Sequence, residues 1–150
     1  MENKNKKTQM QKLQAALVRR KTRHFFTASV SSHRTVPPHH TVVYDNVVYS
    51  IGGGYNPATG EFTCPTAGMY RFDLGVMTQP LQSLNVWIEV FNVRMVRTVA
   101  DGASGFPSAC NQLEVHLDKG DVVKVTSGEI VSYLHGGTYN TFTGVMTSQD

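Results

Sequence analysis

The sequence predicts an all-β domain, a sandwich or jelly roll of antiparallel strands, over most of its 150 residues. Three observations support this prediction. Short segments rich in Val, Thr, Phe and Tyr follow one another after residue 24, separated by turns of Gly, Pro, Asn and Asp. Several of them alternate between apolar and polar side chains, as strands with one buried face do. No helical pattern lies between them, which argues against an alternating βαβ fold.

The first element is a basic leader over residues 1–24, either disordered or a short helix. It holds eight Lys or Arg against one acid, whereas residues 25–150 hold six Lys or Arg against ten acids, so a leader of +7 precedes a body of −4. Met10, Leu13 and Leu17 follow helical spacing and predict a short amphipathic helix. Such a helix is marginal alone, so we expect it to self-associate, for example as a trimer, or to dock on the domain.

The charge distribution and hydropathy also limit the partners. The positive charge lies on a polar extension and not on a folded face, so we expect no nucleic acid as partner. No segment is long and apolar enough to cross a bilayer, and the first residues lack the apolar region of a signal peptide. We therefore expect no membrane insertion.

The strands are expected in eight segments, in chain order: residues 25–32, 41–51, 61–65, 68–77, 84–100, 111–117, 121–127 and 140–148. Between them, residues 56–60, NPATG, predict a turn, because Pro presets φ and Gly permits a positive φ. Pro65 ends the next strand because it has no amide hydrogen for a ladder. Alternation in residues 68–77 puts Tyr70, Phe72 and Leu74 on one face, as core anchors.

At these residues the chain resembles the C1q globular-head domain family. Residues 55–72, YNPATGEFTCPTAGMYRF, are similar to the family pattern YNxxTGxFTCPxxGxYxF. Residues 25–36 resemble its first strand, residues 116–125 its Leu-x-x-Gly-Asp-x-Val segment, and residues 140–146 its closing Phe-x-Gly strand. The chain departs from the pattern at three positions. The family has Phe where this chain has Tyr44, Asn or Asp where it has Ser50, and Phe or Tyr where it has Leu74. The resemblance covers residues 26–146.

The resemblance implies a ten-stranded antiparallel jelly roll of the tumour-necrosis-factor (TNF) type over residues 25–150, assembled as a homotrimer with both termini at one end. It also implies an extracellular, secreted protein. The chain has no Gly-x-y repeat and so no collagen stalk. It looks most similar to the soluble C1q-domain proteins of invertebrates, especially molluscs, which act in innate immunity as pattern-recognition proteins or lectins.

Candidate ligand-binding residues lie in two polar, Gly-containing loops, at residues 101–107 and 135–140. Their side chains suit hydroxyl-rich ligands, and equally suit plain solvated loops. The candidates are Asp101, Ser104, His135, Thr138, Tyr139 and Asn140.

A second candidate surface is an aromatic patch. If Val86, Ile88 and Val90 face the core, Trp87 and Phe91 face outward together, as a sugar-stacking or, preferably, a subunit-contact patch. The residues assigned to this trimer interface or patch are Trp87, Phe91, Tyr70, Phe72 and Phe142.

No metal is assigned and no cofactor is certain. Asp118 and Asp121 are weak candidates for Ca²⁺, but their sequence is also that of a hairpin turn, which we favour. Cys64 and Cys110 form no metal motif and are either bridged or free. No catalytic motif is present, so we expect no enzyme activity.

The expected function is therefore a non-enzymatic trimeric module for pattern recognition. It is expected to bind microbial polysaccharides or envelope components in the manner of a lectin. The alternative is a trimeric signalling or matrix ligand recognised by a protein receptor, in the clefts between subunits.

Overall fold

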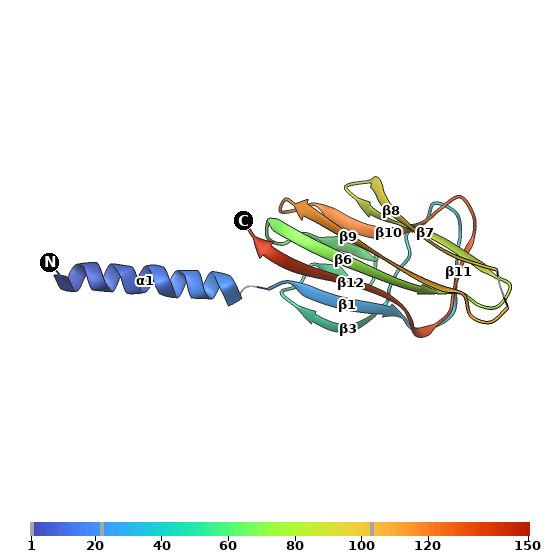
Figure 1. Ribbon diagram of the computed structural model, residues 1–150, viewed down its shortest axis with the longest axis horizontal. Helices are drawn as coiled ribbons and strands as arrows, with labels where there is room; N and C mark the ends of the chain where they lie inside the picture. The colour runs from blue at the N-terminus through green and yellow to red at the C-terminus, as the bar shows by residue number, and fades with distance from the viewer. Residues whose placement is uncertain (1, 22, 103) are drawn as a thin grey trace.

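The computed structural model describes residues 2–21, 23–102 and 104–150 as one helix followed by a β-sandwich (Figure 1). The first sheet has five strands in the order β3-β1-β12-β6-β9. Their bounds are β1 (Phe25–Val30), β3 (Asn46–Ile51), β6 (Gly68–Met77), β9 (Ser108–Leu117) and β12 (Gly137–Gln149).

The second sheet also has five strands, in the order β4-β5-β10-β7-β8, and faces the first. Its strands are β4 (Tyr55–Asn56), β5 (Glu61–Thr63), β7 (Ser83–Val90), β8 (Val93–Asp101) and β10 (Val122–Ser127). A small pair, β2 (Arg34–Val36) with β11 (Ser132–Leu134), flanks the sandwich. All pairings are antiparallel, so the predicted ten-stranded jelly roll is confirmed.

The two ends of the sandwich differ. The helix leads into β1 at one end of the sandwich, and the C-terminus lies at the same end (Figure 1). At this end, Met146 N donates a hydrogen bond of 2.9 Å to His24 O. This arrangement agrees with the resemblance, which implies both termini at one end. We call the opposite end, which carries the β1–β2, β8–β9 and β11–β12 connections, the apex.

Five aromatic rings from both sheets pack together in the core, and we call them the core ring cluster: Phe26, Tyr55, Phe62, Phe72 and Phe142. Neighbouring ring centroids lie 4.6–5.8 Å apart, and the four Phe side chains are buried. Gly144 packs against this cluster, and a Cβ atom there would come within 2.4 Å of the Phe26 ring and 2.8 Å of the Phe72 ring. Aromatic packing therefore requires the glycine of the Phe-x-Gly segment.

The predicted turn at residues 56–60 is confirmed. Gly60 N donates to Asn56 O at 2.9 Å, Gly60 has φ of 78°, and Asn56 Oδ1 accepts from Ala58 N. Strand β5 then ends at Thr63, two residues before Pro65.

Two expected elements differ in the structure. Residues 84–100 form a hairpin rather than one strand, because Phe91 and Asn92 adopt positive φ values of 50° and 61° and join β7 to β8. Two residues of positive φ are the requirement of a tight type I′ hairpin. Of the expected segment 41–51, only residues 46–51 form a strand.

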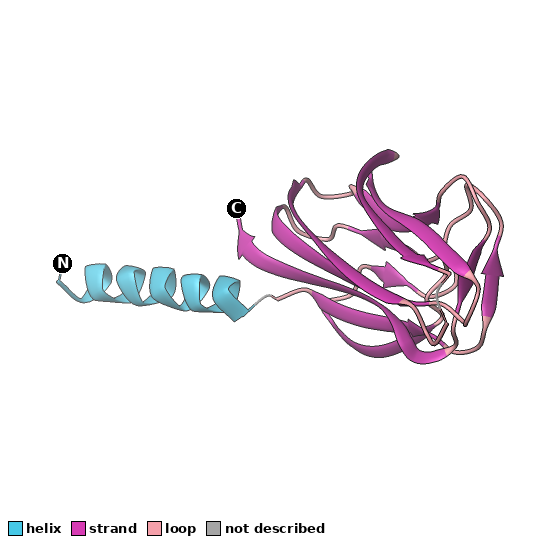
Figure 2. Cartoon of the chain, turned by 45° about the vertical axis from the view of Figure 1, so that its right-hand side comes forward, coloured by secondary structure: helices cyan, strands magenta, loops and turns pink. Residues whose placement is uncertain are grey.

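The leader forms a longer helix than expected, α1 (Glu2–Lys21), which extends away from the sandwich (Figures 1 and 2). It is not docked: Met10 and Leu13 are 60% and 57% exposed, and residues 2–16 are all exposed. The side chain of Leu17 lies outside the described part of the chain. Among the residues that the structure describes, no helix has the length and hydrophobicity of a transmembrane segment.

Candidate functional site

The apex gathers four rings, three from the connections and Tyr139 from the start of β12, and we call them the apex ring cluster: His33, Phe106, His135 and Tyr139. His135 is central, with its ring centroid 4.6 Å from His33, 5.1 Å from Phe106 and 4.8 Å from Tyr139. Phe106 and Tyr139 are about half exposed, at 54% and 52%. The cluster therefore offers flat apolar surface to solvent beside two imidazoles.

Hydrogen bonds to the backbone position the His33 ring and the main chain of His135. Gly136 N donates to His33 Nδ1 at 2.8 Å, so the neutral His33 ring carries its hydrogen on Nε2. His135 N donates to Met77 O at 3.0 Å, and His135 Nδ1 is buried without a hydrogen-bond partner among the described residues. Since His33 Nδ1 already accepts a hydrogen bond, His33 Nε2 is poorly suited to bind a metal and well suited to donate to a hydroxyl oxygen.

Asn140 supports the apex ring cluster from below. Its Nδ2 donates to Met77 O and to His135 O, both at 2.8 Å, and its Oδ1 accepts from Met77 N at 3.2 Å. The side chain is fully buried. Asn140 therefore positions His135 and is unavailable to a ligand, which corrects its assignment as a ligand-contacting residue.

Asp45 holds the loop that carries His33. Its carboxylate accepts from Ser31 N at 3.0 Å and from the Ser31 hydroxyl, and pairs with Arg34 Nη2 at 3.0 Å. Burial alone would raise the pKa of Asp45, but the hydrogen bonds from Ser31 and the charge of Arg34 outweigh it and lower the pKa. The apex ring cluster thus depends on a charged carboxylate.

The other predicted loop residues lie apart from this cluster or at its rim. Thr138 is exposed beside Tyr139, Ser104 is exposed in the β8–β9 loop, and Asp101 ends β8 opposite Ser83. Sequence patterns singled out neither Phe106 nor His33. No local signal identifies them, because the cluster joins loops that are far apart in the chain.

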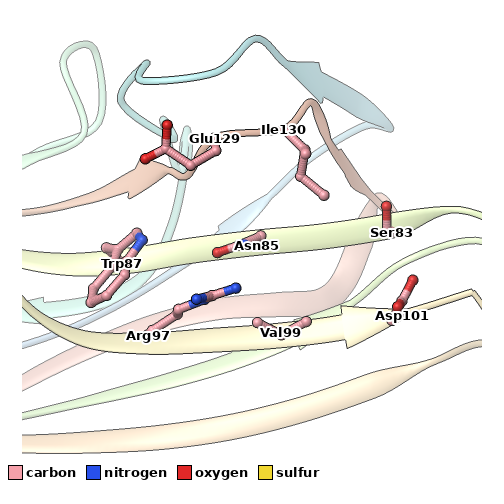
Figure 3. Close-up of a pocket in the computed structure, with 8 residues that line it drawn as sticks. All are labelled: Ser83, Asn85, Trp87, Arg97, Val99, Asp101, Glu129 and Ile130. Carbon is pink, nitrogen blue, oxygen red and sulfur yellow. The ribbon is translucent and has the colours of Figure 1, made fainter.

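A second concave surface lies on the outer face of β7 and β8, beside the β10–β11 connection (Figure 3). We call it the Trp87 groove, and its volume is about 410 Å³. It is lined by Ser83, Asn85, Trp87, Arg97, Val99, Asp101, Glu129 and Ile130.

Trp87 is half-buried, and its ring is the centre of a charged network. Arg94 and Arg97 place their guanidinium carbons 5.4 and 5.8 Å from the indole centroid. Arg94 also bonds Glu129 at 3.0 Å and lies 3.7 Å from Glu89. The hydrogen bond from Arg94, together with the nearby His39, lowers the pKa of Glu129.

The expected aromatic patch needs correction. Val86 and Ile88 are buried and Trp87 lies on the opposite face, but Phe91 is 70% exposed in the hairpin turn and not on a strand. Tyr70, Phe72 and Phe142 are buried inside one chain, because alternation directs them into the core. They cannot form part of a surface.

Asp118 and Asp121 form a turn in which Asp121 Oδ2 accepts from Asp118 N at 2.9 Å. Within residues 2–21, 23–102 and 104–150, no group of three or more His, Cys, Asp or Glu is placed to hold a metal ion. Cys64 and Cys110 are free thiols, the first buried and the second exposed. Burial raises the pKa of Cys64, so that thiol stays protonated and unreactive at neutral pH.

Comparisons with known proteins agree with this architecture. The family model "C1q domain" matches residues 25–147. The chain is 31% identical over 114 residues to Complement C1q and tumor necrosis factor-related protein 9 of Mus musculus, covering 73% of the chain and 34% of that protein. It spans less than half the length of the curated relatives it matches.

Two solved structures share the fold. The globular domain of zebrafish complement 1qA superimposes with a TM-score of 0.72 at 16% identity, covering 85% of this chain and 99% of that one. Eiger TNF of S. frugiperda superimposes with a TM-score of 0.68 at 11% identity, and the match covers 85% of this chain and 93% of that one. None of the relatives named here is molluscan, so the likeness to molluscan proteins stays a prediction.

Proposed function

Because the chain belongs to the C1q domain family, we propose that it forms a homotrimeric module that recognises glycans or other repeated envelope components of microbial surfaces. The family supports a recognition or signalling module as the general role, and its members generally bind rather than catalyse. We propose an extracellular location on the same ground, since the family is typically secreted. In this proposal residues 1–24 are a leader outside the recognition domain of residues 25–150.

The apex ring cluster is the observation that carries this proposal. Phe106 and Tyr139 present apolar ring faces, and the exposed His33 adds polar groups beside them. Sugars combine an apolar ring face with hydroxyls that both donate and accept, so rings beside polar groups suit them. The cluster also lies at the end away from the termini, where a tethered subunit is free to meet a surface (Figure 1).

Exposed apolar residues on edge strands support assembly into trimers. Val48, Tyr49 and Ile51 on β3 are 57%, 57% and 44% exposed, and β8 exposes Val93 and Met95. An uncovered apolar edge is an aggregation hazard that assembly removes. Three apex sites on one face would raise avidity over single-site affinity by about 10² to 10⁴.

The test is binding of the purified protein to an array of bacterial and fungal envelope glycans, with and without a chelator. We expect selective binding that falls in a Phe106→Ala, Tyr139→Ala double variant. Loss on chelation would direct attention to Asp101, Asp118 and Asp121 as Ca²⁺ ligands. Sedimentation showing a stable monomer at micromolar concentration would contradict the trimer.

The second candidate is a signalling ligand for a protein receptor. It is favoured by the 31% identity to a C1q and tumor necrosis factor-related protein and by the fold shared with Eiger TNF. If a folded trimer binds none of the glycans on the array, the result would favour this candidate.

A further inference from the structure

The Trp87 groove is built from regular strands rather than from loops. Three cross-strand pairs form its floor: Ser83 with Asp101, Asn85 with Val99, and Trp87 with Arg97. Alternate residues on a strand repeat every 6.6–6.8 Å, so three successive pairs span about 13 Å. The floor therefore has a fixed length and spacing, which is the preorganisation that a binding site requires.

One wall of the groove comes from a different part of the chain. Glu129 and Ile130, between β10 and β11, stand over β7 (Figure 3). Gly128 N donates to Asn85 O at 2.8 Å, and Asn85 N donates to Ser132 Oγ at 3.0 Å. These bonds on both sides of residues 129–130 tie the wall to the floor.

Arg97 differs from its neighbour Arg94. Arg94 is bonded to Glu129, whereas among the described residues no acid lies within ion-pair distance of Arg97. Contact with the indole of Trp87 holds the Arg97 guanidinium at the groove, as Figure 3 shows. Its N–H donors are available to a ligand.

The charges of the groove nearly cancel. Arg97 is opposed by Asp101 at the other end, and Glu129 is neutralised by Arg94, while His39 Nε2 lies 3.1 Å from the Glu129 carboxylate. A polyanion would meet two carboxylates and a cation would meet Arg97, so neither suits the whole groove. Trp87, Val99 and Ile130 supply apolar surface between these polar ends. The lining thus matches a neutral ligand with apolar faces and a rim of groups that both donate and accept.

We propose that the Trp87 groove is a second saccharide site, which binds a linear neutral oligosaccharide along β7 and β8. Its sugar rings lie against Val99, Ile130 and the exposed part of the indole. Arg97 donates to hydroxyl oxygens at one end, and Asp101 accepts from hydroxyls at the other. The inference rests on the proposed function, because it assumes the same class of ligand, but it places that ligand on the side of the sandwich and not at the apex.

The test uses Trp87 as its own reporter, since it is the only tryptophan in the chain. The full chain is titrated with laminarihexaose, cellohexaose and mannohexaose, and Kd for the groove is obtained from the change in tryptophan fluorescence. For at least one of them we expect a saturable fluorescence change, and at least a tenfold weaker Kd in Arg97→Ala and Val99→Glu. Both side chains are exposed, so these variants are expected to keep the fold, which an unchanged unfolding midpoint checks.

A Tyr139→Ser variant is the matched control, because it removes an apex ring and leaves the groove intact. Its Trp87 titration is expected to equal that of the parent chain. Unchanged Kd values in both groove variants would overturn the second site, and array binding that still requires Phe106 and Tyr139 would then leave the proposed function standing. No binding to the array and none to the three hexasaccharides would overturn both.

Discussion

The core ring cluster and the apex ring cluster have almost the same spacing between ring centroids but opposite environments. Centroids lie 4.6–5.8 Å apart in the core and 4.6–5.1 Å apart at the apex. The core rings are carried mainly by strands and buried among apolar neighbours, whereas the apex rings are carried largely by connections and half exposed. Close spacing of rings alone therefore does not tell a structural cluster from a surface available for binding.

The two clusters also differ in what holds them. Apolar burial and close packing around Gly144 hold the core rings. Hydrogen bonds from Asn140 and Gly136, and the Asp45 carboxylate, hold the apex. The contacts between core rings involve no titratable group, whereas the apex depends on a carboxylate. Acid should therefore destabilise the apex ring cluster and not the core ring cluster. The predictions below test this contrast.

Phe72→Ala should give the largest effect. Removing a buried Phe side chain costs about 3–5 kcal/mol, because the cavity it leaves cannot fully collapse. Urea unfolding should show this loss. Phe106→Ala, the same change at the apex, is the matched control, and an equal loss from both would contradict the contrast.

Gly144→Ala should be next. The added methyl group would overlap the rings of Phe26 and Phe72, and overpacking of a core costs about 1–3 kcal/mol. The thermal unfolding midpoint measures it. Gly75→Ala on β6 is the control, because neither glycine has a positive φ and the Cβ atom at position 75 meets only Thr141 Oγ1, at 3.2 Å. Equal losses in the two variants would remove the ring argument.

Asp45→Asn should cost about 1 kcal/mol at pH 7, because Ser31 and Arg34 lose a charged acceptor. The folded-state pKa of Asp45 is lowered, so its contribution is present above the unfolded pKa of about 3.9 and is lost as pH falls through the folded value. The stability gap between variant and parent should therefore close in acid.

Urea unfolding at pH 7 and below pH 3 measures that gap. Asp73→Asn is the control, since the Arg71–Asp73 pair is exposed and such pairs contribute about 0–1 kcal/mol. A gap for Asp45→Asn that is constant with pH would show that the carboxylate charge has no role.

Combined Phe106→Ala and Tyr139→Ala should have the smallest effect on stability, about 0.5 kcal/mol or less per site, because both side chains are half exposed. Glycan binding should nevertheless weaken at least about tenfold, which corresponds to about 1.4 kcal/mol. Chemical denaturation and the glycan array give the two readouts. Loss of stability without loss of binding would reverse the roles assigned to the two clusters.

Much of the fold could be predicted because it is encoded locally. Period-2 alternation identified Tyr70, Phe72 and Leu74 as core residues, and Pro57 with Gly60 identified the turn before β5. Even so, Tyr70 and Phe72 were also assigned to a surface patch, because alternation gives the face of a strand and not which layer covers it. Phe91 was misplaced because the hairpin depends on the positive φ values of two adjacent residues that are not glycine.

The family, the jelly roll, the aromatic core and the uneven charge between leader and domain could all be inferred from the chain alone. These features depend on residue type and on spacing within single segments. The fold was needed to show that His33, Phe106 and His135 meet at the apex and that Asn140 is buried beneath them. It was also needed to place Arg97 over Trp87 beside residues 129–130. Such contacts join loops and strands far apart in the chain, and their geometry follows from how the two sheets pack, which no local pattern records.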